Sequence, residues 1–121
     1  MPKRILIVDD DPSIMVALQF LMEEQGYGVM TAESGEIALE MIYQYKPDIV
    51  LLDIMLPGID GWEVCKLVRL NPECQHIKII FLTAKSSEAD IIKGLELGGD
   101  AYITKPFLND ELVAMVKEHL D

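Results

Sequence analysis

Short apolar runs alternate five times with segments of helical periodicity along this 121-residue sequence. The apolar runs are nearly continuous, which is typical of strands that are buried on both faces of a sheet. Strands are expected at residues 5–8, 28–32, 49–52, 77–82 and 101–104. Because parallel strands need a crossover connection, usually a helix, this alternation predicts a parallel sheet covered by helices.

Each expected helix begins at a residue that can cap it. A short polar side chain at this point accepts a hydrogen bond from the first turn, and Pro12 suits the first position of the first helix. The candidate capping residues are Asp11, Ser34, Asp60, Ser87 and Asn109. Gly26 and the Gly98–Gly99 pair are expected to end the first and fourth helices.

The number of strand and helix units limits the fold class. Five units are too few for a closed barrel of eight strands. The open alternative is an α/β, flavodoxin-like, doubly wound fold, with five parallel strands in the order 2-1-3-4-5 and helices on both faces. At this length we expect residues 1–121 to form a single domain.

Charge restricts the classes of partner. The chain has 21 acidic and 10 basic residues, a formal net charge of −11, which repels nucleic-acid phosphates and anionic membranes. No apolar run approaches the roughly 18 residues of a membrane span. We therefore expect a cytoplasmic protein that binds neither nucleic acid nor membranes directly.

Polar side chains follow four of the expected strands. Asp9 and Asp10 end the first strand, Asp53 the third and Thr83 the fourth, while Lys105 follows the fifth. In an open parallel sheet, ligands bind beyond the carboxyl ends of the strands near the reversal of strand order. These five side chains are therefore expected to meet at one edge, although an acidic residue at a strand end can also be only a helix cap.

Three carboxylates held together repel one another unless a cation neutralises them. Mg²⁺ prefers such oxygen ligands and keeps several waters, so it suits an open site, whereas His76 and His119 belong to no zinc-type cluster. Lys105 and Thr83 could contact phosphoryl oxygens, and Asp53 could be the nucleophile, since carboxylates do form aspartyl phosphates.

Four segments carry a family resemblance. They are residues 5–11 (ILIVDDD), 48–61 (DIVLLDIMLPGIDG), 80–84 (IFLTA) and 100–107 (DAYITKPF). In this order, each at a strand end, they resemble the signature blocks of response regulator receiver domains in two-component signalling. The resemblance extends over essentially the whole chain.

The resemblance implies a role for each acidic residue. Asp9, Asp10 and Asp53 would hold Mg²⁺ together with the backbone carbonyl of Met55, and Asp10 would be the more direct ligand of the Asp9–Asp10 pair. Asp53 would accept a phosphoryl group from a sensor histidine kinase or a phosphotransfer protein. The domain would catalyse only its own phosphorylation and slow dephosphorylation, so it is not an enzyme in the usual sense.

The same resemblance implies a switch. Thr83 and Lys105 would contact the phosphoryl group, and Thr83 and Tyr102 would be the pair that moves, while the Lys105–Pro106 bond is usually cis in the family. Output would pass through the surface of the fourth helix, the fifth strand and the fifth helix. Candidate surface residues there include Ile91, Lys93, Leu95 and Tyr102. The partner would be a downstream protein effector, a fused output domain or a second copy of the chain.

A few positions depart from the family pattern or vary within it. Gly99 stands where many members have alanine, which predicts a looser turn after the fourth helix. Met55 and Lys85 lie two residues after Asp53 and Thr83, at positions that influence access of water to the phosphate. Trp62, the only tryptophan, is interpreted as a structural residue at the start of the third helix.

Two other functions fit parts of the pattern. A Mg²⁺-dependent phosphatase of the haloacid dehalogenase type would also use an aspartate at a strand end, but it needs a second aspartate where Met55 stands. A flavin-binding module would need a Ser/Thr/Gly-rich phosphate loop, whereas the first strand is followed by three aspartates.

Overall fold

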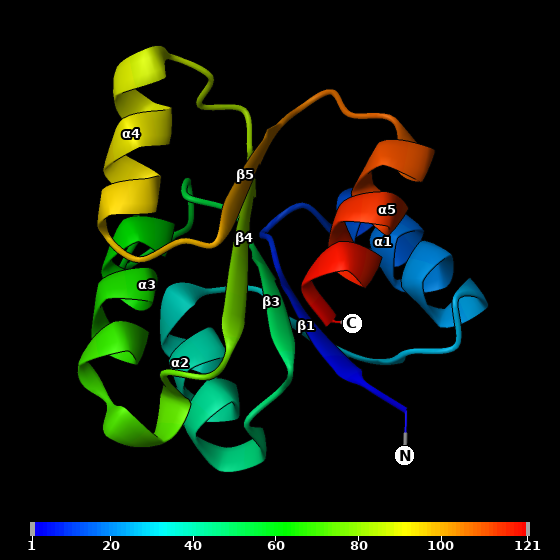
Figure 1. Cartoon of the computed structure of the whole chain (residues 1–121), viewed down its shortest axis with the longest axis horizontal. Coiled ribbons are helices and arrows are strands. Elements are labelled where there is room, and N and C mark those ends of the chain that lie inside the picture. The colour runs from blue at the N-terminus through cyan, green and yellow to red at the C-terminus, as the bar shows by residue number, and fades with distance from the viewer. Residues whose placement is uncertain (1, 121) are drawn as a thin grey trace.

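The computed structural model describes residues 2–120, in which five strands alternate with five α-helices (Figure 1). The elements are β1 (Arg4–Val8), α1 (Pro12–Glu24), β2 (Gly28–Ala32), α2 (Gly35–Tyr45), β3 (Ile49–Leu52), α3 (Gly61–Leu70), the 3₁₀ helix η1 (Pro72–Cys74), β4 (Lys78–Thr83), α4 (Glu88–Glu96), β5 (Ala101–Thr104) and α5 (Asn109–Leu120). Among the helices of this described part, none is long and apolar enough to cross a bilayer.

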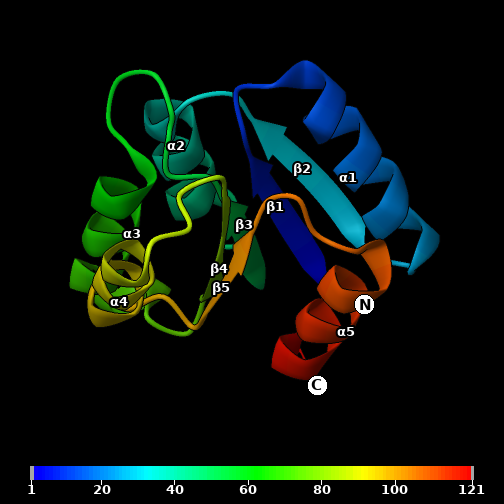
Figure 2. The same cartoon turned by 90° about the horizontal axis from the view of Figure 1, so that it is seen from above.

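The strands form one parallel sheet in the order β2-β1-β3-β4-β5. Helices α1 and α5 cover one face, and α2, α3 and α4 cover the other (Figures 1 and 2). This arrangement confirms the predicted doubly wound, flavodoxin-like fold. The strand order reverses at β1, because β2 pairs with one edge of β1 and β3 with the other.

The core has two layers, one on each side of the sheet. Successive side chains of a strand point to opposite faces, so Ile5 and Ile7 pack in one layer and Leu6 and Val8 in the other. All four are buried. Because helices cover both faces, every position of β1 after Arg4 must be apolar, which is why the sequence shows continuous runs.

Four of the five helices start after the expected cap, whereas α5 begins at Asn109 itself. The side chains of Asp11, Ser34, Asp60 and Ser87 each accept a hydrogen bond from a backbone N–H in the first turn of α1, α2, α3 and α4. β4 begins one residue later than expected, at Lys78, because the N–H of Ile77 donates to the carbonyl of Cys74 at 3.1 Å in the turn that follows η1.

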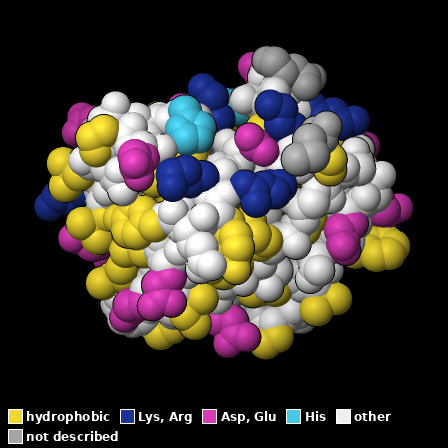
Figure 3. Space-filling model, turned by 90° about the horizontal axis from the view of Figure 1, so that it is seen from below, with side chains coloured by type: hydrophobic (Ala, Val, Ile, Leu, Met, Phe, Trp, Pro, Cys, Tyr) yellow, Lys and Arg dark blue, Asp and Glu magenta, His cyan; other side chains and the backbone are white. Residues whose placement is uncertain are grey.

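Basic residues begin two of the strands. Arg4 and Lys78 are the exposed first residues of β1 and β4, and Lys and Arg side chains gather on the face at the amino ends of the strands (Figure 3). Asp9 and Asp53 follow the carboxyl ends of β1 and β3. A cation is therefore attracted to the carboxyl edge of the sheet, where the polar residues of the sequence blocks lie.

The turn between α4 and β5 is closely packed at Gly99. A Cβ built at Gly99 would lie 2.6 Å from Cε2 of Phe81, which is fully buried in β4. The aromatic ring therefore occupies the space that an alanine methyl group would need. This close packing against Phe81 accounts for a glycine at position 99, and the looser turn stays a prediction.

This packing predicts a coupled pair of substitutions. Gly99→Ala should lower the free energy of unfolding by about 1–3 kcal/mol, because the methyl group overpacks the core against Phe81. In a Phe81→Leu background the same change should cost less, since the shorter side chain leaves room for the methyl group. Urea unfolding of the four proteins measures the coupling, and equal costs in both backgrounds would refute it.

Candidate functional site

The pairing of β1 with β3 brings the acidic residues together. Val8 lies opposite Leu52, and the N–H of Asp53 donates to the carbonyl of Val8 at 3.0 Å. One carboxylate oxygen from each of Asp9, Asp10 and Asp53 can be chosen so that all three lie within 4.8 Å of one another. Asp9 and Asp53 are buried and Asp10 is exposed, so the cluster opens to solvent on the Asp10 side.

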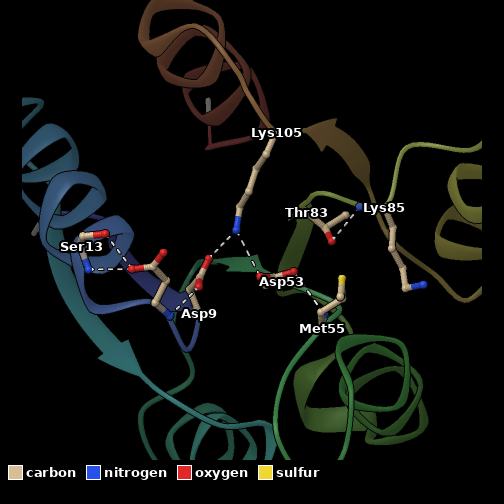
Figure 4. Close-up of polar contacts among 8 residues, drawn as sticks. Asp9, Ser13, Asp53, Met55, Thr83, Lys85 and Lys105 are labelled. Atoms are coloured by element: carbon tan, nitrogen blue, oxygen red, sulfur yellow. Dashed lines mark hydrogen bonds and ion pairs between the residues drawn. The ribbon is translucent and has the colours of Figure 1, made fainter.

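Lys105 lies between two of these carboxylates. Its Nζ donates to Oδ2 of Asp9 at 2.7 Å and to Oδ2 of Asp53 at 3.1 Å (Figure 4). Its backbone N–H donates to the carbonyl of Thr83 at 2.8 Å, which anchors the residue beside the end of β4. The Lys105 ammonium thus connects the end of β5 to the ends of β1 and β3.

Burial and charge act in opposite directions on this ion pair. Burial raises the pKa of Asp9, and the hydrogen bond and charge of Lys105 lower it only in part. Burial alone would lower the pKa of Lys105, but its bonds to Asp9 and Asp53 and their negative charges raise it overall. Lys105 therefore stays protonated and supplies one fixed positive charge to the site.

Local turns orient the carboxylates. Asp9 Oδ1 accepts from the N–H of Asp11 at 2.9 Å, and Asp53 Oδ1 accepts from the N–H of Met55 at 3.2 Å. The Asp10 carboxylate makes no hydrogen bond or ion pair with the described residues. It is therefore the group with the most free acceptor positions for an incoming ligand.

These donors fit a hard divalent cation. All three side chains offer carboxylate oxygens, and the exposed side leaves room for the waters that Mg²⁺ retains. The cluster contains neither histidine nor cysteine, so it has no soft ligand that would favour zinc. The fourth expected ligand, the Met55 carbonyl, belongs to the turn fixed by Asp53, and its role stays a prediction.

The expected switch residues meet at Lys85. Thr83 is fully buried, and its Oγ1 accepts from the N–H of Lys85 at 3.3 Å. The Tyr102 hydroxyl donates to the carbonyl of the same lysine at 2.6 Å. Thr83 and Tyr102 are therefore connected through one residue of the β4–α4 loop, and their movement as a switch pair stays a prediction.

The sequence patterns did not indicate a role for Glu36, the second residue of α2. Its Oε1 accepts from the N–H of Ile59 at 3.3 Å, and its carboxylate fills the space beside Gly58, where a Cβ would lie 2.2 Å from Oε2. Glu36 therefore braces the loop that follows Asp53. A glutamate in the first turn of a helix is usually read as a favourable charge for the helix dipole, and no local signal marks a contact 23 residues away.

The comparisons with known proteins agree with this geometry. The profile of the response regulator receiver domain family matches residues 5–117. The chain belongs to that family. The Lys105–Pro106 bond is cis, as the family resemblance implied. The chain is also similar to solved structures of receiver domains.

Three solved structures illustrate the likeness. A candidate response regulator from Chloroflexus aurantiacus is 42% identical with a TM-score of 0.94, and the match covers 99% of this chain and 98% of that one. The BeF₃-activated N-terminal receiver domain of RstA from Klebsiella pneumoniae is 35% identical with a TM-score of 0.91, covering 98% of each chain. The chemotaxis protein CheY4 of Vibrio cholerae is 28% identical with a TM-score of 0.93, covering 99% of this chain and 100% of that one.

Membership of the family fixes the general function. Receiver domains are the phosphorylation-activated, regulatory phosphoacceptor domains of two-component response regulators, and they typically bind Mg²⁺ at an acidic pocket. The acidic cluster of this receiver domain provides such a pocket at the carboxyl edge of the sheet.

The environment of Tyr102 gives a prediction for its phenol. Burial, with smaller effects from the charges of Asp90 and Asp53, raises its pKa from 10.0 to about 12. The stability that the neutral phenol contributes should therefore be complete below pH 10 and be lost as the pH rises toward 12. Tyrosinate absorbance in the parent minus that in Tyr102→Phe isolates this titration, and a midpoint near 10 would show that the phenol is not held as described.

Proposed function

We propose that residues 1–121 form a single receiver domain that acts as a cytoplasmic signalling switch, with Asp53 as its phosphoacceptor. The phosphoryl group would come from a sensor histidine kinase or a phosphotransfer protein. The observation that supports this proposal most strongly is the cluster of Asp9, Asp10 and Asp53 oxygens within 4.8 Å, with the Lys105 ammonium bonded to two of the three residues.

In the proposed reaction, a carboxylate oxygen of Asp53 attacks the phosphorus atom of the donor. The new O–P bond forms as the bond between phosphorus and the donor breaks, and the donor keeps the electron pair of that bond. Phosphoryl transfer depends mainly on positioning and on neutralising charge on the phosphoryl oxygens. The backbone N–H of Met55 orients the nucleophile by its bond to Oδ1 of Asp53.

The remaining residues neutralise charge. Asp9, Asp10, Asp53 and the Met55 carbonyl would hold Mg²⁺, which supplies positive charge beside the transferred group when bound. Lys105 would exchange its bond to Asp53 for one to a phosphoryl oxygen while its bond to Asp9 limits its movement. The Thr83 hydroxyl would donate to a further phosphoryl oxygen.

The proposed domain turns over only its own phosphoryl group. A phosphatase would use a second acid two residues after the nucleophile to protonate a leaving group, but that position is Met55, which is 57% exposed. The phosphoryl group should therefore leave Asp53 only by slow hydrolysis. This supports the interpretation as a switch and not as a multiple-turnover enzyme.

Output is proposed to pass through α4, β5 and α5. Tyr102 connects this face to the site by its bond to the Lys85 carbonyl, and a groove on the face is lined by Ile91, Tyr102, Phe107 and Leu108. Leu95 and Leu108 are exposed at 45% and 72%, and large exposed apolar side chains are typical of a contact surface. The proposed partner is a downstream protein effector, a fused output domain or a second copy of this domain.

The phosphoacceptor assignment predicts a simple mass change. Incubated with a small-molecule phosphodonor and Mg²⁺, the parent should gain the mass of one phosphoryl group, and Asp53→Asn should gain none. Asp60→Asn is the matched control, because it changes an aspartate of the same loop to a residue that caps α3 equally well, and it should still be phosphorylated. A full gain of mass in Asp53→Asn would exclude Asp53 as the acceptor.

The metal site predicts a thermal shift. Mg²⁺ at a hundredfold excess over its Kd should stabilise the fold by about 2.7 kcal/mol and raise the Tm. Asp10→Ala should remove most of this rise and, by relieving repulsion with Asp9 and Asp53, should not lower the Tm of the metal-free protein.

Asp11→Asn is the matched control for the metal site. It removes a neighbouring negative charge but keeps a capping side chain for α1, so it should retain the Mg²⁺ response. Titration calorimetry gives the affinities directly. Equal Mg²⁺ affinity in the parent and Asp10→Ala would place the metal elsewhere.

A further inference from the structure

Trp62 receives two lysine side chains on its indole ring. Nζ of Lys93, from α4, lies 3.8 Å from the ring centroid, and Nζ of Lys85, from the β4–α4 loop, lies 5.4 Å from it. Both distances are within the range of cation–π attraction, which is strongest for tryptophan. The ring thus joins the start of α3 to two segments beyond β4.

Lys85 is the residue through which the switch pair is connected. Its N–H bonds to Thr83 and its carbonyl to Tyr102, so its backbone lies at the phosphoacceptor edge of the sheet. Its side chain nevertheless points away from Asp53 (Figure 4). The contact with Trp62 explains this direction, because the acidic cluster would otherwise attract the ammonium.

The Lys85 ammonium can leave the Trp62 ring without breaking a hydrogen bond of the indole. The buried Nε1 of Trp62 has no hydrogen-bond partner among the described residues. The ring is therefore held by packing and by the two ammonium groups, and losing one ammonium breaks no hydrogen bond of the indole. Lys93, at the shorter distance, can keep α4 against the ring after Lys85 has left.

We propose that Trp62 is a positioning residue, which holds the Lys85 ammonium away from the metal site until phosphorylation of Asp53 draws it inward. This inference rests on the proposed function, since it takes the acidic cluster as the metal site and Asp53 as the phosphoacceptor. The phosphoryl group brings about −1.5 to −2 charges, which compete with the ring for a lysine on a flexible stem.

According to the proposal, a released Lys85 ammonium weakens the binding of Mg²⁺ but strengthens the binding of a phosphoryl group or its analogue. Before phosphorylation, a released Lys85 would repel Mg²⁺ from the carboxylates. Once a phosphoryl group or its analogue beryllofluoride is present, the same ammonium would attract it. If Trp62 had only a structural role, its loss would loosen the fold and weaken the binding of both ligands. Opposite changes in the two affinities therefore indicate positioning of Lys85.

Nuclear magnetic resonance can observe the contact of Lys85 with the Trp62 ring directly. In the parent, the ring current of Trp62 should shift the Lys85 and Lys93 side-chain signals. Addition of Mg²⁺ and beryllofluoride should return the Lys85 signals toward their ordinary positions and leave those of Lys93 shifted. A Lys85 shift that is unchanged when beryllofluoride binds would overturn the proposed release.

Titration calorimetry then tests positioning. Trp62→Leu should weaken Mg²⁺ binding about two- to fivefold and strengthen beryllofluoride binding at saturating Mg²⁺ by a similar factor, which is the size expected for a surface cation–π contact. Trp62→Phe, which keeps an aromatic face, should show smaller changes of the same signs and is available if the leucine variant does not fold.

A double-mutant cycle completes the test. In a Lys85→Met background, Trp62→Leu should change neither affinity, whereas in a Lys93→Met background, a matched loss of one ammonium from the same ring, it should act as in the parent. Affinities that fall together, or effects that persist without Lys85, would overturn this inference alone. Equal Mg²⁺ affinity in the parent and Asp10→Ala would instead overturn the proposed function.

Discussion

The reversal of strand order at β1 is the constraint on which the site depends. After β1 the chain turns to α1 on one face of the sheet, whereas after β3 it turns to α3 on the other face (Figure 2). The two connections therefore separate and leave the ends of adjacent strands uncovered. Because Val8 and Leu52 are paired, Asp9 and Asp53 become neighbours in this crevice.

Charge balance explains why this crevice is suited to a cation and a phosphoryl group. Three carboxylates and the Lys105 ammonium leave two negative charges at the cluster, which equals the charge of one divalent cation. Lys105 bonds to the two buried aspartates, and the exposed Asp10 lies toward solvent, where a hydrated ion can enter. The described structure thus holds its buried carboxylates by one fixed ammonium and leaves the rest of the neutralisation to a ligand.

The fold and the main site could be predicted because they follow from local patterns. Continuous apolar runs mark strands covered on both faces, and a polar residue marks the end of each run, so Asp9 and Asp53 were placed at one edge correctly. The contact of Glu36 with Gly58, the ring of Phe81 against Gly99 and the two lysines on Trp62 were not predicted. Each depends on side-chain packing between distant segments, which leaves no periodic signal.

Packing around Tyr102 shows how a change at the site could reach the surface. The Tyr102 ring lies 5.7 Å from that of Phe81, centroid to centroid, and a Cβ built at Gly94 of α4 would come within 3.1 Å of it. The ring therefore has little free space between β4 and α4, and its hydroxyl is bonded to the Lys85 carbonyl. If the backbone carbonyl of Lys85 moves, the Tyr102 hydroxyl must either lose this hydrogen bond or move with it. Movement of the Tyr102 ring would displace α4, because a close-packed interface shifts between discrete arrangements. Lys93, which directly precedes Gly94 in α4, lies 3.8 Å from the centroid of the Trp62 ring, so the same part of α4 contacts both Tyr102 of β5 and Trp62 of α3.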